Sequence, residues 1–251
     1  MVKQEDYFPE LNSFKFKDIF NGHDYFWHAL NNIAGYVEGF LSDKEDNTHL
    51  LHDCFSREDG FLLCRKKFIA ETDIVVKGLN IYFAAGVLVE PTALIQSHVL
   101  VDSNSTVRHG AYVRGKVIVG EHSTIGHTTE IKNSIFMNHS EAGHFAYLGD
   151  SIIGCYVNLG AGTKFANLPF RTLEEKKKKV KKTLSLKYEG KLIDNSMEKL
   201  GVIAGDSVEF GCNSVTCPGT FLLPGSMVFP AVSVRKGFYR KKEVVRRSNL
   251  V

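Results

Sequence analysis

The sequence predicts an all-β protein, a parallel β-helix of hexapeptide repeats, preceded by a small helical segment. The main observation is a six-residue period that neither a 3.6-residue helix nor an alternating strand produces, and that is typical of hexapeptide β-helices. β-Branched aliphatic side chains recur at this spacing at Val89, Ile95, Val101, Val107, Val113, Val119, Ile125 and Ile131. A second observation is a series of small or β-branched residues at a fixed distance after these aliphatics, and a third is one amphipathic stretch near the N-terminus.

Four places after each of these residues stands a small or β-branched side chain. These positions are Ala93, Val99, Ser105, Ala111, Val117, Ser123, Thr129 and Ile135. We interpret each hexapeptide as one short strand whose aliphatic side chain points into a narrow triangular prism, with the offset position filling a corner. Three strands then make a coil of about 18 residues, and coils stack at roughly 4.8 Å. Backbone polar groups find partners in the coils above and below.

The period predicts where the β-helix is interrupted. It breaks after Ile135, resumes at Leu148, Ile153 and Leu159, and breaks again after Gly162. It returns from Ala204 with Phe210, Val215, Phe221 and Met227. We therefore expect a β-helix over residues 81–237 with a basic loop extruded at about 164–200.

The segment before the repeat is expected to be acidic and partly helical over residues 1–80. Its apolar side chains fall mostly on one helical face at Phe26, Trp27, Leu30, Ile33, Val37, Phe40 and Leu41. We expect this face to cover the end of the β-helix or a neighbouring subunit, and Trp27 to be ordinary core packing. Residues 238–251 are expected to form a basic tail.

Composition and charge restrict the possible functions. The 251 residues contain no run near the ~20 apolar residues of a membrane span, and the acidic start does not fit a secretory signal. Five cysteines without a CxxC pair favour a reducing, cytoplasmic setting. Net charge is −6 over residues 1–73, +5 over 171–182 and +6 over 235–251. Such basic patches on a near-neutral body favour anionic small molecules over a nucleic-acid groove, or are simply a solvated loop and tail.

The 18-residue coil also predicts which polar residues lie above one another. Arg114 and Lys132 are 18 apart, and each follows an interior aliphatic residue. Two cations this close repel unless an anion lies between them, so the pair predicts a phosphate clamp; the alternative is that both project into water. His109 and His127 are also 18 apart, with His122 nearby, and could bind zinc or simply occupy coil corners.

Residues 111–163 carry a family resemblance. Their sequence, AYVRGKVIVGEHSTIGHTTEIKNSIFMNHSEAGHFAYLGDSIIGCYVNLGAGT, resembles the acetyltransferase half of the bacterial bifunctional enzyme that makes UDP-N-acetylglucosamine. The resemblance implies a left-handed β-helix, an exception to the right-handed crossover rule. It also implies a homotrimer that transfers acetyl from acetyl-CoA to glucosamine-1-phosphate.

The resemblance assigns roles to individual residues. It implies that His144 is the catalytic base and that the Ala161 amide meets the thioester carbonyl. It further implies a set of substrate-binding residues: Arg114 and Lys132 for the phosphate, Tyr147, Asn158 and Asn167 for the sugar, and Lys199 from the loop. Chemistry supports these types, because imidazole can deprotonate an ammonium near neutral pH and a fixed N–H can stabilise an oxyanion. No metal and no covalent intermediate are needed, and Cys155 is expected to be a small buried hydrophobe.

Departures from the family pattern leave other functions open. The uridyltransferase half is missing, Leu168 stands where the family has an aromatic residue, and Cys212 replaces a serine associated with the acyl donor. Three alternatives remain. The first is an acyltransferase acting on a UDP-sugar with acyl carrier protein as donor, the second is a zinc hydratase like γ-class carbonic anhydrase, and the third is a non-catalytic trimeric scaffold.

Overall fold

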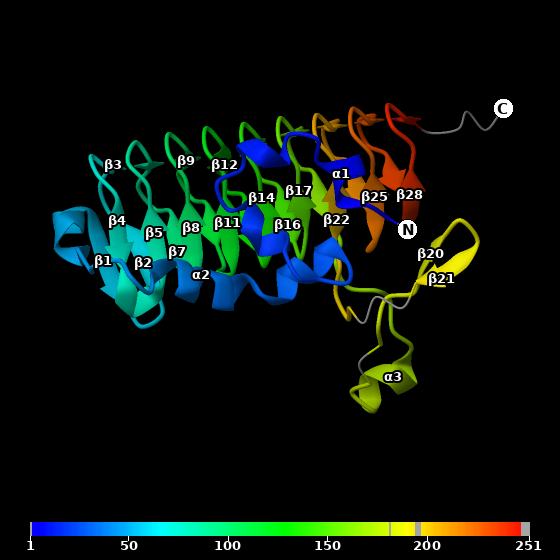
Figure 1. The fold of residues 1–251 in the computed structure, drawn as a ribbon, viewed down its shortest axis with the longest axis horizontal. Helices are drawn as coiled ribbons and strands as arrows, with labels where there is room; N and C mark the ends of the chain where they lie inside the picture. Colours follow the sequence, from blue (N-terminus) through cyan, green and yellow to red (C-terminus); the bar gives the residue numbers. More distant parts are fainter. Residues whose placement is uncertain (1, 181, 194–196, 247–251) are drawn as a thin grey trace.

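The computed structural model describes residues 2–180, 182–193 and 197–246. Within these residues, three nine-stranded sheets form the sides of a long triangular solenoid (Figure 1). Its coils are parallel, and the structure confirms the predicted left-handed parallel β-helix. A separate two-stranded hairpin projects from the body.

The three sides are called sheets A, B and C. Sheet A consists of β1 (Phe55–Glu58), β2 (Phe61–Cys64), β7 (Leu94–Gln96), β10 (Tyr112–Val113), β13 (Glu130–Lys132), β16 (Tyr147–Gly149), β19 (Lys164–Phe165), β24 (Val215–Thr216) and β27 (Ser233–Val234). Sheet B consists of β3 (Phe68–Ile69), β6 (Leu88–Val89), β9 (Thr106–Val107), β12 (Thr124–His127), β15 (Glu141–His144), β18 (Asn158–Leu159), β23 (Glu209–Phe210), β26 (Met227–Val228) and β29 (Val244–Val245). Sheet C consists of β4 (Ile74–Val76), β5 (Ile81–Phe83), β8 (Val99–Val101), β11 (Val117–Val119), β14 (Ser134–Phe136), β17 (Ile152–Ile153), β22 (Val202–Ala204), β25 (Thr220–Leu222) and β28 (Gly237–Tyr239).

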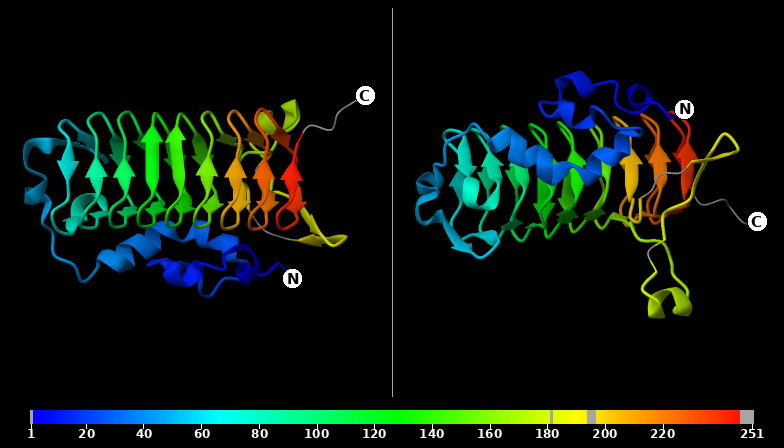
Figure 2. Two further views of the ribbon diagram at one scale, coloured as in Figure 1. Left: turned by 90° about the horizontal axis from the view of Figure 1, so that it is seen from above. Right: turned by 60° about the horizontal axis from the view of Figure 1, so that its bottom comes forward.

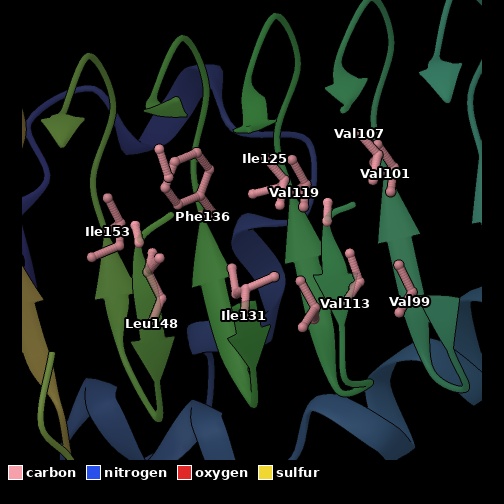
Figure 3. Close-up of a cluster of buried hydrophobic side chains, with 14 of the residues drawn as sticks. Val99, Val101, Val107, Val113, Val119, Ile125, Ile131, Phe136, Leu148 and Ile153 are labelled. Atoms are coloured by element: carbon pink, nitrogen blue, oxygen red, sulfur yellow. The ribbon is translucent and has the colours of Figure 1, made fainter. Parts of the chain in front are cut away.

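The hexapeptide aliphatics fill the interior of the prism, where they stack from coil to coil (Figure 3). Val113 pairs with Ile131, 18 residues later, as the period predicts. Ile131 then pairs with Leu148, 17 residues later, so the coil is one residue shorter from here to the extruded loop. The coil is shortened at the corner after β13, and Phe136 fills the next interior position on sheet C.

Four positions of the predicted interior series are wrong by one residue. Ile135 pairs with Ile118 and packs on the outer side of sheet C, while Ser134 takes the corner position of Val117. In the last coils Val215 and Met227 are exposed, and Phe221 packs on the outer side of sheet C. The interior residues there are Thr216, Leu222 and Val228, each directly following the predicted one.

Antiparallel strands close the N-terminal end of the solenoid. Strands β2, β3 and β4 each pair antiparallel with the first parallel strand of their sheet, and β1 pairs antiparallel with β2. Folding the chain back in this way covers the sheet edges that would otherwise offer unpaired backbone groups. Two short helices, η4 (Thr48–Cys54) and η5 (Lys77–Leu79), join these strands to the rest of the chain.

The N-terminal helices lie along the outer side of sheet C (Figures 1 and 2). They are α1 (Gln4–Tyr7), η1 (Leu11–Ser13), η2 (Lys17–Phe20), η3 (Phe26–Asn31) and α2 (Ile33–Leu41). Trp27 is fully buried, and its ring meets that of Phe221 edge to face at 5.1 Å. The predicted apolar face therefore covers a flat side of the solenoid rather than its end, and Trp27 is core packing. Sheet C is buried on both sides.

The extruded segment leaves the solenoid after β19 and returns at β22. It contains α3 (Leu173–Lys177), whose start is a capping box formed by Thr172 and Glu175, and the hairpin β20 (Leu186–Tyr188) with β21 (Lys191–Ile193). Parallel coils continue through β28 and β29, so the end of the solenoid lies within the range assigned to the basic tail. Among the described residues, no helix is long and apolar enough to cross a membrane.

Candidate functional site

Arg114 and Lys132 lie at the ends of neighbouring strands of sheet A, at the corner leading to sheet C. Each has a carboxylate partner: Arg114 Nη1 lies 2.6 Å from Glu130 Oε1, and Lys132 Nζ lies 3.0 Å from Asp150 Oδ2. The hydrogen bond that Arg114 donates to Glu130 raises the pKa of the Arg114 guanidinium. The stacked cations are therefore balanced by protein carboxylates, and their proximity does not by itself require a bound anion.

Asp150 is the most connected group at this corner. Its carboxylate is nearly buried, with an exposed fraction of 8%, and accepts hydrogen bonds from Lys132 Nζ, Asn133 Nδ2 at 2.9 Å and Asn167 Nδ2. Uniform coil spacing does not place it above Lys132, because the coil here is 17 residues long and Lys132 pairs with Gly149, while Asp150 occupies the next, left-handed corner position. Glu130 was predictable from the sequence, because it lies two residues before Lys132 on the same strand and residues two apart on a strand share a face.

Tyr147 and Asn167 lie next to this cluster on the following coils. A Cβ at Gly149 would come within 2.6 Å of Asn167 Nδ2 and 2.7 Å of Tyr147 Oη, so glycine is needed for both to lie here. Burial raises the pKa of Tyr147, which keeps the phenol neutral, with Glu130 and Asp150 acting in the same direction. The structure thus brings together Arg114, Lys132, Tyr147 and Asn167, with Glu130 and Asp150 added.

A cavity of about 560 Å³ opens at the same corner. Arg114, Lys116, Lys132 and Asp150 line it from the solenoid, and Leu30 and Asn31 line it from the N-terminal segment. Sequence reasoning missed these last two residues, because they precede the repeat and reach the cavity only through the packing of the N-terminal segment on sheet C.

His144 lies at the opposite edge of sheet A, at the corner between sheets B and A. It ends β15, pairs with His127 on the preceding strand, and is exposed. Ala161 occupies the next coil at the same corner, where Gly162 N donates to His144 O at 3.1 Å. The Ala161 N–H has no acceptor among the described residues. His144 is not among the residues that line the cavity, and two residues separate it from Tyr147 along the coil.

The glycines beside Ala161 are explained by coil stacking. A Cβ at Gly160 would lie 2.5 Å from Cys212 N, and one at Gly162 would lie 2.3 Å from Asn213 Oδ1. Gly162 also has a φ of +76°, in the left-handed region that favours glycine. These glycines let the next coil approach closely, which is a requirement of the fold itself.

Two predicted site residues lie apart from the cluster. Asn158 points outward from sheet B, where its Nδ2 donates to Glu209 Oε2 at 3.0 Å. Lys199 is exposed near the return of the extruded segment, one residue before Leu200, whose N–H donates to Asn167 O at 3.1 Å. Cys155 is buried, and burial raises its pKa to about 12, as expected of a structural thiol.

The histidines considered for zinc lie at two different corners. His109 and His127 stack with ring centroids 5.2 Å apart on the side of His144. His122 stacks on His139 at the corner between sheets C and B. No cluster of three or more His, Cys, Asp or Glu able to hold a metal occurs among the described residues.

The fold places the chain in the class of left-handed β-helix proteins of hexapeptide repeats, with a polar cluster across one side. Residues 95–244 match the family model described as the GMPPB C-terminal domain, and the chain belongs to this family. The match confirms a hexapeptide-repeat domain like the acetyltransferase half noted in the sequence.

Curated relatives agree with this assignment. The chain is 29% identical to the bifunctional protein GlmU of Wigglesworthia glossinidia brevipalpis over 67% of this chain and 31% of the relative. It is 30% identical to the bifunctional protein GlmU of Methanococcus vannielii over 70% of this chain and 46% of the relative. A bifunctional sugar-1-phosphate nucleotidylyltransferase/acetyltransferase of Sulfurisphaera tokodaii is 31% identical over 59% of this chain and 39% of the relative. The matches span less than half the length of these relatives.

Proposed function

We propose that this protein is an acetyl-CoA-dependent N-acetyltransferase acting on an amino-sugar phosphate, with glucosamine-1-phosphate as the leading candidate. The observation that supports this best is the cluster on sheet A, where Arg114 and Lys132 adjoin Tyr147 and Asn167. Cations beside a phenol and a carboxamide suit a phosphate joined to a sugar. The names of the relatives, which include sugar-1-phosphate and acetyltransferase, point the same way.

In the proposed reaction Arg114 and Lys132 hold the phosphate, while Tyr147 and Asn167 contact the sugar. Asn158 and Lys199 lie apart from this cluster, and only the family resemblance assigns them to the substrate. His144 removes a proton from the sugar ammonium, and the free amine forms the new C–N bond at the thioester carbonyl. The Ala161 N–H stabilises the resulting oxyanion. The carbonyl then re-forms as the C–S bond breaks, the thiolate takes the proton held by His144 and leaves as CoA, and the amide nitrogen loses its remaining extra proton to solvent.

The chain fits acetyl-CoA at one identifiable point. The Ala161 amide lies one coil beyond His144 and has no acceptor among the described residues, as a donor awaiting a ligand carbonyl would. When bound, the cofactor supplies the activated acetyl group. This chain's residues orient the acceptor and accept its proton.

A homotrimer accounts for the exposure of the base. In one chain His144 lies open to solvent, and so does its neighbour Phe145, whose side chain is 51% exposed. A second subunit packed against this edge would cover these side chains and exclude water from the amine. The five free cysteines support a reducing cytoplasmic location.

Thiol release from acetyl-CoA in the presence of glucosamine-1-phosphate tests the proposal. Because general bases contribute about 10²–10⁴ to the rate, His144→Ala should lower kcat at least about a hundredfold. His122→Ala is the matched control, since His122 is also an exposed corner histidine but lies at a different edge. Equal turnover by the wild type and His144→Ala would refute the assigned base.

A further inference from the structure

The cavity beside Arg114 and Lys132 is larger than one phosphate needs. Its volume is about 560 Å³, within the range of pockets that hold ligands of roughly 300–1,000 Å³. A phosphate has the size of a few water molecules, each of which takes about 30 Å³. Most of the cavity would therefore stay open if it received only the phosphate of a sugar monophosphate.

The spare space lies on the side of the cations away from the proposed sugar site. Tyr147 and Asn167 follow Lys132 on later coils of sheet A. The cavity extends the other way, to Gln96 and Ser97 on the coil before Arg114. A sugar held by Tyr147 with its phosphate on the cations would direct the distal side of that phosphate into this space.

Lys116 supplies a third cation in the cavity. It follows Arg114 at the corner, in the left-handed conformation with a φ of +53° that places its side chain in one column with His98 and Asn133. Arg114 and Lys132 each have a carboxylate partner, but the Lys116 ammonium has neither an ion pair nor a hydrogen bond among the described residues. It is the cation at this corner left available to a second phosphate.

The far wall carries groups suited to a nucleoside. Gln96 offers a carboxamide and Ser97 a hydroxyl from the solenoid, and Asn31 offers a carboxamide from the N-terminal segment, where its Nδ2 also donates to Met197 Sδ at 3.3 Å. His98 is held in place, since its Nε2 lies 2.9 Å from Glu38 Oε1 of α2 and 3.2 Å from Asn80 Nδ2. The solenoid and the N-terminal segment thus each contribute polar groups to this part of the cavity.

We infer that the acceptor is an amino sugar carried on a nucleoside diphosphate, with its second phosphate on Lys116 and its nucleoside against Asn31, Gln96 and Ser97. This inference rests on the proposed function and names the substrate class of the same site. Acetyl transfer proceeds as before, because the nucleotide is remote from the amine.

Two measurements on the full chain test this inference. The first compares kcat/KM for UDP-glucosamine and for glucosamine-1-phosphate at saturating acetyl-CoA. The second is calorimetric titration with ADP, CDP, GDP and UDP. Lys116→Asn removes the cation while keeping a residue that tolerates positive φ. Lys242→Asn is the control, because Lys242 is also exposed with a φ of +58° but lies in the last coil.

The wild type should prefer UDP-glucosamine and bind at least one nucleoside diphosphate. Lys116→Asn should reduce both that preference and that affinity about tenfold or more, the value of one charge-assisted hydrogen bond, with Lys242→Asn unchanged. If glucosamine-1-phosphate is acetylated at least as well and none of the four nucleotides binds, the inference is wrong and the proposed function stands. If a nucleotide binds through Lys116 but neither acceptor reacts, the cavity is a nucleotide site and the acetyltransferase proposal fails.

Discussion

The two edges of sheet A differ in how completely one chain builds them. At the corner with sheet C, the Asp150 carboxylate accepts hydrogen bonds from Lys132, Asn133 and Asn167, and the N-terminal segment lines part of a cavity beside this cluster. At the corner with sheet B, His144 and Phe145 are exposed. We call the first the finished edge, because one chain forms its hydrogen-bonded cluster and its cavity. We call the second the unfinished edge, because His144 and Phe145 lie exposed in one chain. Under the proposed function, this difference means that the substrate would bind within one chain and that the reacting centre would be completed by a second subunit.

The largest effect is expected at the finished edge. Asp150→Asn removes the negative charge that balances Lys132, whose side chain is 19% exposed. It also places an amide donor opposite the Asn133 and Asn167 amides, which are themselves donors. Breaking a buried pair costs about 3–5 kcal/mol, so the free energy of unfolding should fall by about 3 kcal/mol in urea denaturation. Asparagine tolerates the φ of +51° at this position, so the backbone is not the cause.

The control for Asp150→Asn lies at the unfinished edge of the molecule. Glu209→Gln also removes a carboxylate bonded to a carboxamide, that of Asn158, but both side chains are exposed. It should change the free energy of unfolding by less than about 0.5 kcal/mol. Equal losses in the two variants would show that the two edges are not different in kind.

The next prediction concerns whether the open edge is covered by a second subunit. Phe145 has a φ of +36°, which costs roughly 1 kcal/mol of backbone strain for a residue with a Cβ. Its side chain is 51% exposed, so burial within one chain does not compensate this strain. If Phe145 stays in solvent, Phe145→Asn should raise stability by about that amount. If a second subunit covers Phe145, the assembly formed by Phe145→Asn should dissociate at a protein concentration at least about tenfold higher than the wild-type assembly does, because the buried apolar side chain is lost.

Sedimentation velocity over a dilution series distinguishes these outcomes, and we expect dissociation. Tyr156→Asn is the matched control: Tyr156 is an exposed aromatic residue with a φ of +58°, but it stacks on His139 at 4.7 Å within the chain. A stable Phe145→Asn assembly with raised stability would contradict the idea that this edge is an interface.

The sequence predicted the architecture because the prism interior imposes its own period. The one-residue errors at Ile135 and Phe221 have a physical cause on sheet C, and those at Val215 and Met227 follow because they were placed six residues either side of Phe221. The N-terminal segment buries the outer side of this sheet, so outward residues such as Ile118, Ile135 and Phe221 are as apolar as inward ones. A strand buried on both sides loses its alternation, and the period alone does not say which residue points inward.

The candidate site was predictable where it depends on coil spacing. Arg114 and Lys132 follow from that arithmetic, whereas Asp150 does not, because the coil shortens to 17 residues after β13 and Lys132 pairs with Gly149. The cavity was not predictable, because Leu30 and Asn31 reach it through packing between segments far apart in the chain. Lys116 gave no signal either, since its position depends on a left-handed corner conformation rather than on the strand pattern.

The smallest effect separates the two carboxylates of the finished edge. Glu130 pairs with Arg114 at the surface, with side chains 33% and 41% exposed, and such pairs contribute about 0–1 kcal/mol. Glu130→Gln should therefore leave the urea midpoint nearly unchanged, in contrast to Asp150→Asn. It also frees Arg114 and removes a negative charge beside the proposed phosphate position, so the KM for the acceptor should fall about twofold to fivefold, most clearly at low salt. A raised KM would mean that Glu130 orients Arg114 for the phosphate, and the Arg114–Glu130 pair would then belong to the binding surface as a unit.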